Sequence, residues 1–201
     1  MAPVDVDVRP LDPRDILTAA LVAARGMRDN PAHIAALGND PDKRVRVMER
    51  LFRRLLTFDR RPTVVAWSGN RLVGVADSAE PGHCQPTGRA RLKLLPPMLA
   101  AGTAVPRMAR WVGAWAKRDP TRPHSHFGPF AVDLDLQGRG IGSQLLAQYC
   151  RTMDETATFS YLETDKAENV RLYERFGYVV VEKAQVLGID NWFMTREPSG
   201  G

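Results

Sequence analysis

The stretch FAVDLDLQGRGIGSQLL, residues 130–146, decides the fold of this chain. A short apolar run leads into glycines at 138, 140 and 142, and a helical pattern of apolar residues follows. The first amides of a helix have no internal acceptor, and the helix dipole favours negative charge there. Glycine allows a ligand to approach the backbone closely. The sequence therefore predicts a strand, an anion-binding turn that is typical of phosphate sites, and a helix.

Two common phosphate loops do not fit this stretch. A Walker A loop requires a lysine after its last glycine, and none stands here. A Gly-x-Gly-x-x-Gly dinucleotide fingerprint does not fit either, because a reading from Gly138 or Gly140 has another residue where the third glycine should stand. Glu163 occupies the place of a ribose-binding acid, but only about 60 residues follow the loop, too few for a dinucleotide domain that starts there. The remaining pattern is Gln/Arg-x-x-Gly-x-Gly/Ala, which fits residues 137–142.

Outward from the loop, hydrophobic periodicity predicts one domain over residues 1–201, with strands and helices in mixed order. We expect 80–105 to be irregular because it contains four prolines. Hairpin and strand–helix–strand connections both occur, which predicts a single mixed sheet with helices on both faces. The expected strands are 4–9, 63–68, 71–78, 126–132, 159–165, 178–188 and 191–197, and the expected helices start at Pro13, Asp42, Pro106, Gly142 and Ala167.

Composition is that of an ordinary globular protein, with 44% hydrophobic and 25% charged residues. Cys84 and Cys150 make no disulfide framework, and we see neither a signal peptide nor an apolar run long enough for a membrane helix. We therefore expect a cytoplasmic protein without a membrane partner. The net charge of +5 suits a small polyanionic ligand. The basic helix at 42–61 lacks interleaved aromatic residues, so we interpret it as a solvated face rather than a nucleic-acid surface, and leave any partner of that face open.

Residues 126–178 resemble the acetyl-CoA core of the GCN5-related N-acetyltransferases. The stretch FGPFAVDLDLQGRGIGSQLL is similar to that family's fourth strand, pyrophosphate loop and following helix. YLETDKAENVRLYERFGY is similar to its fifth strand and the next helix. Within the superfamily, LET…N…YERFGY and the ending WFMTREP resemble the puromycin N-acetyltransferases. Leu134 departs from the pattern, since these enzymes often have proline at that turn position.

The resemblance implies an acetyltransferase fold: a single mixed, mostly antiparallel sheet of about six or seven strands, whose fourth and fifth strands splay apart. It also implies acetyl-CoA as co-substrate, with pantetheine lying between the splayed strands. Free backbone groups there need a partner. The residues that the resemblance assigns to acetyl-CoA are Phe130, Ala131 and Val132 on the fourth strand, Gln137, Gly138, Arg139, Gly140, Ile141, Gly142 and Ser143 in the loop, and the side chain of Asn169.

Tyr173 occupies the family's general-acid position. An ordinary tyrosine pKa is about 10 and an ordinary thiol pKa about 8.5, so full proton transfer to the departing thiolate is uphill. We infer that Tyr173 stabilises the thiolate by hydrogen bonding as much as by proton transfer. Glu163, at the end of the fifth strand, is the first candidate for the base that deprotonates or positions the amine. Asp77, His124, His126 and a relayed water are weaker candidates. We expect no metal, because the sequence shows no third ligand near His124 and His126.

The acceptor side is expected within residues 80–115, where Trp111 and Trp115 either line a pocket for an aromatic or nucleoside-like amine or form a core stripe. The predicted reaction is direct acetyl transfer to a primary amine of a small molecule. A non-catalytic acyl-CoA sensor, a protein or peptide N-acetyltransferase and a nicotinamide-binding enzyme stay open as alternatives. The sequence also leaves open the identity of the amine and whether the protein forms a homodimer.

Overall fold

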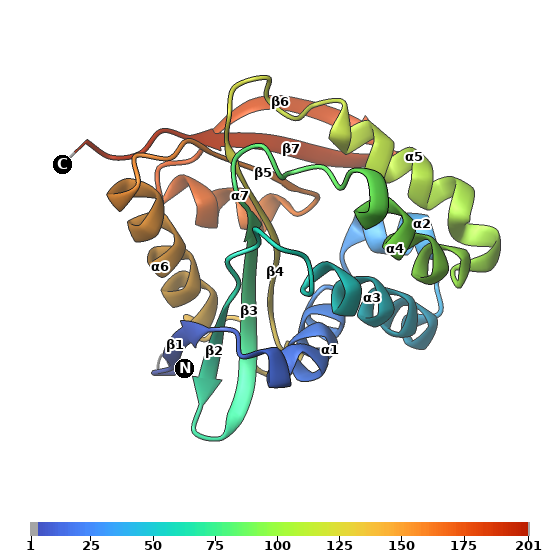
Figure 1. Cartoon of the computed structure of the whole chain (residues 1–201), viewed down its shortest axis with the longest axis horizontal. Coiled ribbons are helices and arrows are strands. Elements are labelled where there is room, and N and C mark those ends of the chain that lie inside the picture. Colours follow the sequence, from blue (N-terminus) through green and yellow to red (C-terminus); the bar gives the residue numbers. More distant parts are fainter. Residues whose placement is uncertain (1–3, 201) are drawn as a thin grey trace.

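A computed structural model describes residues 4–200, and its centre is one seven-stranded sheet (Figure 1). The sheet order is β1-β2-β3-β4-β5-β7-β6. Every neighbouring pair is antiparallel except β4 with β5, which is parallel. The predicted mixed, mostly antiparallel sheet is therefore confirmed. The strands are β1 (Asp7–Pro10), β2 (Val64–Ser68), β3 (Arg71–Ala79), β4 (Ser125–Val132), β5 (Ser160–Thr164), β6 (Val179–Val186) and β7 (Ile189–Arg196).

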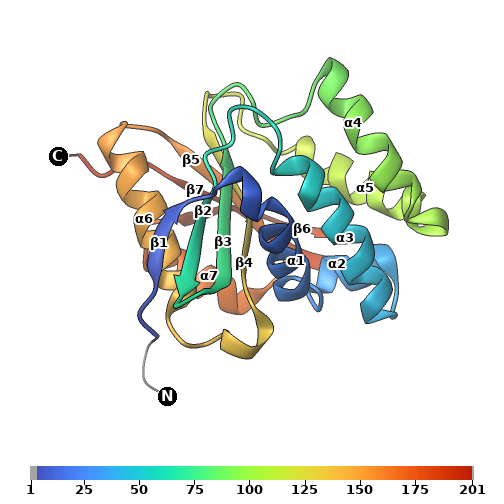
Figure 2. The same ribbon diagram turned by 60° about the horizontal axis from the view of Figure 1, so that its bottom comes forward.

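Helices cover both faces of the sheet, as the sequence predicts. Figure 2 shows α6 on one side of the strands and α1 and α3 on the other. Leu145 and Leu146 of α6 are buried against β3 on the first face, and Ala19 and Ala20 of α1 are buried against β2 and β3 on the second. Within residues 4–200, no helix has the length and apolar character to cross a membrane. The helices are α1 (Ile16–Gly26), α2 (Pro31–Leu37), α3 (Pro41–Leu55), α4 (Gly88–Leu99), α5 (Val105–Ala116), α6 (Ile141–Glu155) and α7 (Ala167–Glu174).

Strands β4 and β5 pair only where they begin, at Ser125 with Ser160 and at His126 with Tyr161. Beyond that point β4 continues against β3 as far as Val132, and β5 continues against β7. The two facing edges therefore separate, and the predicted splay is confirmed. Tyr149 of α6 holds the closed end together, because its hydroxyl lies 2.9 Å from Ser125 Oγ and 2.7 Å from Ser160 Oγ.

One prediction about the region before β4 is wrong. Residues 80–105 were expected to be irregular, yet α4 occupies 88–99 with Pro96 and Pro97 inside its last turn. A proline in a helix removes one backbone hydrogen bond, and near the C-terminal end this breaks little of the ladder. The pattern also does not predict α2, whose seven residues make about two helical turns and which is held by its packing against α5 and α3.

A buried ion pair joins the start of β2 to β3. Arg61 donates to Asp77 Oδ2 from Nη2 at 2.6 Å and to the Gly128 carbonyl at 2.8 Å, while Thr63 donates to Asp77 Oδ1 at 2.7 Å. Burial raises the pKa of Asp77, and the charge of Arg61 opposes that rise. Asp77 was a weaker candidate for the catalytic base; its carboxylate is instead committed to Arg61 and Thr63.

We expect Arg61→Met to lower the free energy of unfolding by about 3–5 kcal/mol, because it leaves the Asp77 charge buried without its partner. Urea unfolding at neutral pH measures this. The matched control is Arg60→Met, whose side chain is 64% exposed and reaches Glu80 at 3.3 Å. An exposed pair of this kind contributes about 1 kcal/mol or less. Equal losses for the two variants would contradict the structural role of Asp77.

Candidate active site

The glycine-rich turn after β4 forms the first of two adjoining cavities. Gly138 and Gly140 have φ values of +74° and +82°, which other residues rarely adopt, and α6 begins directly afterwards at Ile141. The turn therefore directs the N-terminal end of α6 at a cavity of about 500 Å³, called here the loop cavity. The loop cavity is lined by Gly26, Met27, Asn30, Phe130, Ala131, Val132, Leu136, Gln137, Gly138, Gly140, Ile141, Gly142, Ser143, Lys166, Glu168, Asn169, Leu172 and Arg175.

That lining contains all of the residues that the resemblance assigns to acetyl-CoA except Arg139. Arg139 is not among the lining residues within the described part of the chain, and its charge-assisted contact with the pyrophosphate stays a prediction. Lys166 and Arg175 line the cavity and supply positive charge from the other side. Sequence spacing does not reveal them, because they lie more than 20 residues beyond the loop and reach the cavity through the packing of α7.

Gln137 ties the loop to its surroundings through its side chain. Its Nε2 donates to the carbonyls of Gly26 and Val132, each at 3.0 Å. The end of α1 approaches β4 so closely that a Cβ at Gly26 would lie 2.4 Å from the Val132 oxygen. Val132 was expected to offer free backbone groups, and its carbonyl is already engaged. Any contact of Val132 with a ligand therefore falls to its amide N–H.

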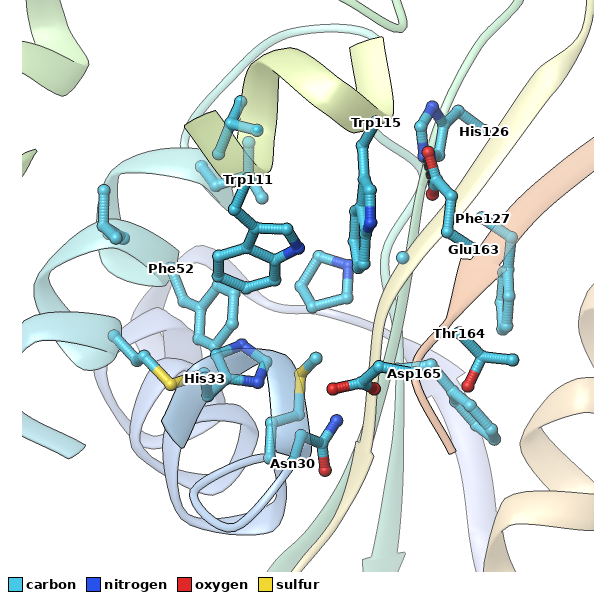
Figure 3. A pocket seen from close by; sticks show the side chains of 18 of the residues that line it. Asn30, His33, Phe52, Trp111, Trp115, His126, Phe127, Glu163, Thr164 and Asp165 are labelled. Atoms are coloured by element: carbon cyan, nitrogen blue, oxygen red, sulfur yellow. Dashed lines mark hydrogen bonds and ion pairs between the residues drawn. The ribbon is translucent and has the colours of Figure 1, made fainter. Parts of the chain in front are cut away.

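The second cavity, called here the aromatic cavity, has a volume of about 330 Å³ and mostly apolar walls (Figure 3). It lies between α2, α3 and α5 on one side and the splayed strands β4 and β5 on the other. Its walls share Met27, Asn30, Phe130 and Asn169 with the loop cavity, so the two cavities meet at the splay. A molecule in one cavity can therefore contact a molecule in the other.

Two tryptophans of α5 form one wall of the aromatic cavity. Figure 3 shows Trp111 and Trp115 pointing toward the space that His33 and Phe52 border from the opposite side. Trp111 meets Trp115 edge to face at 5.1 Å between ring centroids, and meets His33 at 4.8 Å. Trp115 Nε1 donates to Asn191 Oδ1 at 2.9 Å, which fixes the orientation of that ring. Trp111 is buried in the core and also lines the cavity, and the binding of an aromatic amine by the two tryptophans stays a prediction.

Glu163 lies at the end of the aromatic cavity nearest β4. Its side chain is 3% exposed, and Oε2 bonds His126 Nε2 at 2.8 Å. Within residues 4–200, Oε1 has no hydrogen-bond partner. Glu163 therefore combines a carboxylate oxygen that is held by His126 with a second oxygen that can accept a proton. The neighbouring Asp165 serves another purpose, since its Oδ2 accepts from the Ala32 amide at 2.6 Å and caps α2.

Tyr173 comes from α7 and lines the same cavity. Its ring is buried and lies 6.2 Å from the ring of Phe130, the residue that both cavities share. Burial raises the pKa of Tyr173 above its ordinary value, and the charges of Asp165 and Glu163 raise it further. This hydroxyl keeps its proton at neutral pH and can donate a hydrogen bond to an anion that forms beside it.

His124 and His126, two weaker candidates, lie side by side at the beginning of β4. The expectation that they lack further potential ligands is wrong. Cys84 comes close to both rings, and Asp119 lies 3.2 Å from His126 Nδ1. Sequence spacing hides this cluster, because Cys84 precedes α4 and Asp119 follows α5, and only the tertiary fold brings them to β4.

A comparison of this chain with known protein families identifies the family to which it belongs. The acetyltransferase (GNAT) family matches residues 32–178, well over half of the chain. The chain belongs to the GNAT family. Its fold is similar to that of the histone acetyltransferase HPA2 and related acetyltransferase of Corynebacterium glutamicum, with 20% identity, 98% of each chain covered and a TM-score of 0.71.

Two more solved structures share the fold of this GNAT acetyltransferase. The PaiA N-acetyltransferase of Thermoplasma acidophilum, in complex with coenzyme A, has 11% identity and a TM-score of 0.59, with 96% of this chain and 99% of that chain covered. A putative phosphinothricin N-acetyltransferase has 16% identity and a TM-score of 0.58, with 97% and 99% covered. The GNAT family uses acetyl-CoA as co-substrate, so this chain is an N-acetyltransferase that depends on acetyl-CoA.

His33 gives the acetyltransferase a measurable pH signature. Burial, together with the smaller effect of the charge of Arg44, lowers the pKa of His33 from 6.5 to about 3. The unfolded chain binds a proton at this residue below about pH 6.5 while the folded chain does not, so stability falls as pH drops from about 6.5 towards 3. At pH 5 we expect a loss of about 2 kcal/mol from this residue.

The variant His33→Phe keeps an aromatic ring against Trp111 but cannot titrate. Urea unfolding at pH 7 and pH 5 should therefore show a smaller acid loss for the variant than for the unaltered chain, by about 2 kcal/mol. All other titrating groups are common to the two proteins. Identical acid losses would show that His33 is protonated in the folded state or solvated there.

Proposed function

We propose that this enzyme transfers acetyl from acetyl-CoA directly to a primary amine of a small molecule. The observation that carries the proposal is the junction of the two cavities. The loop cavity suits the phosphates and pantetheine of the donor, and the aromatic cavity, with Glu163 and Tyr173 in its wall, suits an acceptor. A volume of about 330 Å³ is in the range of small-molecule sites.

Two kinds of backbone group hold the donor: helix N-terminal amides that bind an anion, and a free strand edge that binds an extended chain. The amides of residues 138–143 bind the pyrophosphate at the N-terminal end of α6, and Lys166 and Arg175 add positive charge. Pantetheine runs along the edge of β4 that faces away from β3, from Phe130 to Val132. Asn169, whose Nδ2 lies 3.4 Å from Thr164 Oγ1, borders both cavities and contacts the pantetheine amides from α7.

The reaction then needs two proton movements at the junction. Glu163 accepts a proton from the ammonium form of the acceptor through Oε1, while His126 holds Oε2 in place. The neutral amine attacks the thioester carbonyl, and the carbon–sulfur bond breaks to give an amide and the CoA thiolate. Tyr173 donates a hydrogen bond to the departing sulfur, and its raised pKa favours this role over complete proton transfer.

The aromatic cavity indicates the kind of amine. Trp111, Trp115 and Phe52 offer aromatic faces to a planar or apolar body. Within residues 4–200, His33 Nδ1 and Trp111 Nε1 are buried without hydrogen-bond partners, so each can bind a polar group of the acceptor. The resemblance of LET…N…YERFGY and WFMTREP to the puromycin N-acetyltransferases supports an aminonucleoside or a similar aromatic amine.

A turnover assay that reads the free thiol of CoA tests this function against a panel of aminonucleosides, other aromatic amines, amino acids and peptides. We expect an aromatic primary amine to give the highest kcat/KM. Turnover confined to peptides would favour a protein or peptide N-acetyltransferase. Calorimetry that shows CoA binding, combined with no turnover on any amine, would favour the non-catalytic sensor.

A further inference from the structure

A cluster of four potential metal ligands lies in the wall of the aromatic cavity, and one of them, His126, also holds Glu163. The Cys84 sulfur and one ring nitrogen from each of His124 and His126 lie within 4.8 Å of one another. Asp119 Oδ1 lies 4.0 Å from His124 Nε2 and 3.2 Å from His126 Nδ1. Ligand atoms around a tetrahedral zinc ion, at about 2.0–2.3 Å from it, are about 3.3–3.6 Å apart. The contact between Asp119 and His126 already has this spacing, and the other ligand atoms must move closer together to enclose such an ion.

Hydrogen bonds on the outer side of the two rings determine which nitrogens face the cluster. His124 Nδ1 lies 2.8 Å from the Arg122 carbonyl, and His126 Nε2 lies 2.8 Å from Glu163 Oε2. Both partners accept hydrogen bonds, so these two nitrogens carry the protons. In neutral rings, His124 Nε2 and His126 Nδ1 then direct lone pairs inward. This is the pattern by which a carboxylate or carbonyl orients a metal-binding histidine.

The inward atoms lack partners of their own. Within residues 4–200, His124 Nε2, His126 Nδ1 and Asp119 Oδ1 are buried and make no hydrogen bond, although two of them are only 3.2 Å apart. His124 is 5% exposed. A metal cation between these atoms would satisfy all of them, whereas a proton on His126 Nδ1 would satisfy only that nitrogen and Asp119 Oδ1. Tyr161 packs edge to face on both rings, at 5.5 and 5.3 Å, and restricts their rotation.

We propose that Cys84, Asp119, His124 and His126 bind one Zn²⁺ ion. One sulfur, two imidazole nitrogens and one carboxylate oxygen suit zinc better than the hard cations Ca²⁺ and Mg²⁺. On binding, the Cys84 thiol loses its proton to solvent and a sulfur–zinc bond forms. Four protein ligands leave no open position, so the ion is structural. It fixes the segment before α4 and the segment after α5 to β4, and so holds the α4–α5 side of the aromatic cavity.

The test measures zinc on the full chain after dialysis against metal-free buffer. We expect one equivalent of Zn²⁺ to bind and to raise the thermal unfolding midpoint. Cys84→Ser should weaken zinc binding by about 10²-fold or more and abolish that rise, since it removes the thiolate ligand. Cys150→Ser is the matched control, because the only other cysteine lies in α6, and it should bind zinc as the unaltered chain does.

Two further measurements keep the result interpretable. Cobalt(II) reports the sulfur ligand directly through thiolate-to-metal charge-transfer absorption, which Cys84→Ser should remove and His124→Gln should reduce. Calorimetric titration with CoA checks that each variant is folded, because the glycine-rich loop lies away from the cluster. The proposal is overturned if the unaltered chain binds no zinc, or if Cys84→Ser binds it with unchanged affinity. Neither readout depends on which amine the enzyme acetylates.

Discussion

Replacing Glu163 by glutamine lowers kcat for the amine acceptor by about 10²- to 10⁴-fold, the usual contribution of a positioned general base. Glutamine has nearly the same shape, and its amide oxygen still accepts from His126 Nε2, so the arrangement in Figure 3 is retained while the proton acceptor is lost. The effect should fall on kcat more than on the KM for acetyl-CoA, since Glu163 lines the aromatic cavity and not the loop cavity. Steady-state thiol release with the best acceptor from the panel measures both constants.

The matched control is Glu155→Gln, which removes an exposed carboxylate at the end of α6. It should leave kcat within about twofold of the unaltered enzyme, because it lies far from both cavities. A Glu163→Gln enzyme with unchanged kcat would exclude Glu163 as the base. A rise in the KM for the amine at constant kcat would show that Glu163 binds and positions the substrate but does not act as the base.

Replacing Tyr173 by phenylalanine lowers kcat by about 10²-fold, the typical cost of removing one donor to a developing anion. Phenylalanine preserves the packing of α7 against Phe130, so the fold and the binding of acetyl-CoA should change little. The burial that raises the pKa of Tyr173 is also what makes its hydrogen bond to a thiolate strong. Calorimetry with CoA and thiol-release kinetics together separate binding from turnover.

Tyr178→Phe provides the control for losing a buried hydroxyl. Tyr178 shares the same core, with its ring 5.8 Å from that of Tyr173, but its hydroxyl bonds Ser160 instead of facing a cavity. Its removal should cost about 1 kcal/mol of stability and leave kcat nearly unchanged. If Tyr173→Phe behaved like Tyr178→Phe, the thiolate would be stabilised by another group, and the hydroxyl of Tyr173 would be structural.

Local patterns were enough to predict most of the fold. The short apolar run at 126–132 predicts β4, the glycines at 138, 140 and 142 predict the turn, and the apolar stripe that follows predicts α6, each within one or two residues. The splay of β4 and β5 came from the family resemblance, and the short pairing at Ser125 and His126 confirms it. The prediction of an irregular segment at 80–105 is wrong. Four prolines there suggest a loop, whereas tertiary packing holds α4 as a helix.

The candidate site was predictable only where its residues are close in sequence or follow a family motif. Tyr173, Glu163 and Asn169 lie on such a motif and line the cavities. The sequence contains no motif that distinguishes Lys166 and Arg175 from charged residues on the surface. His33 and Phe52 reach the aromatic cavity from α2 and α3, and their placement depends on how helices pack across the splay. Contacts of that kind are set by tertiary structure and leave no spacing in the sequence.

The most direct test of the proposed reaction follows the acetyl group itself. The purified enzyme is incubated with acetyl-CoA that carries isotope-labelled acetyl and with a mixture of small primary amines, and the products are identified by mass spectrometry. We predict the label on the nitrogen of an aromatic small-molecule amine, in amounts equal to the free CoA that is released. Label that appears only as acetate, or that stays on the protein chain, would contradict direct transfer to a small-molecule amine.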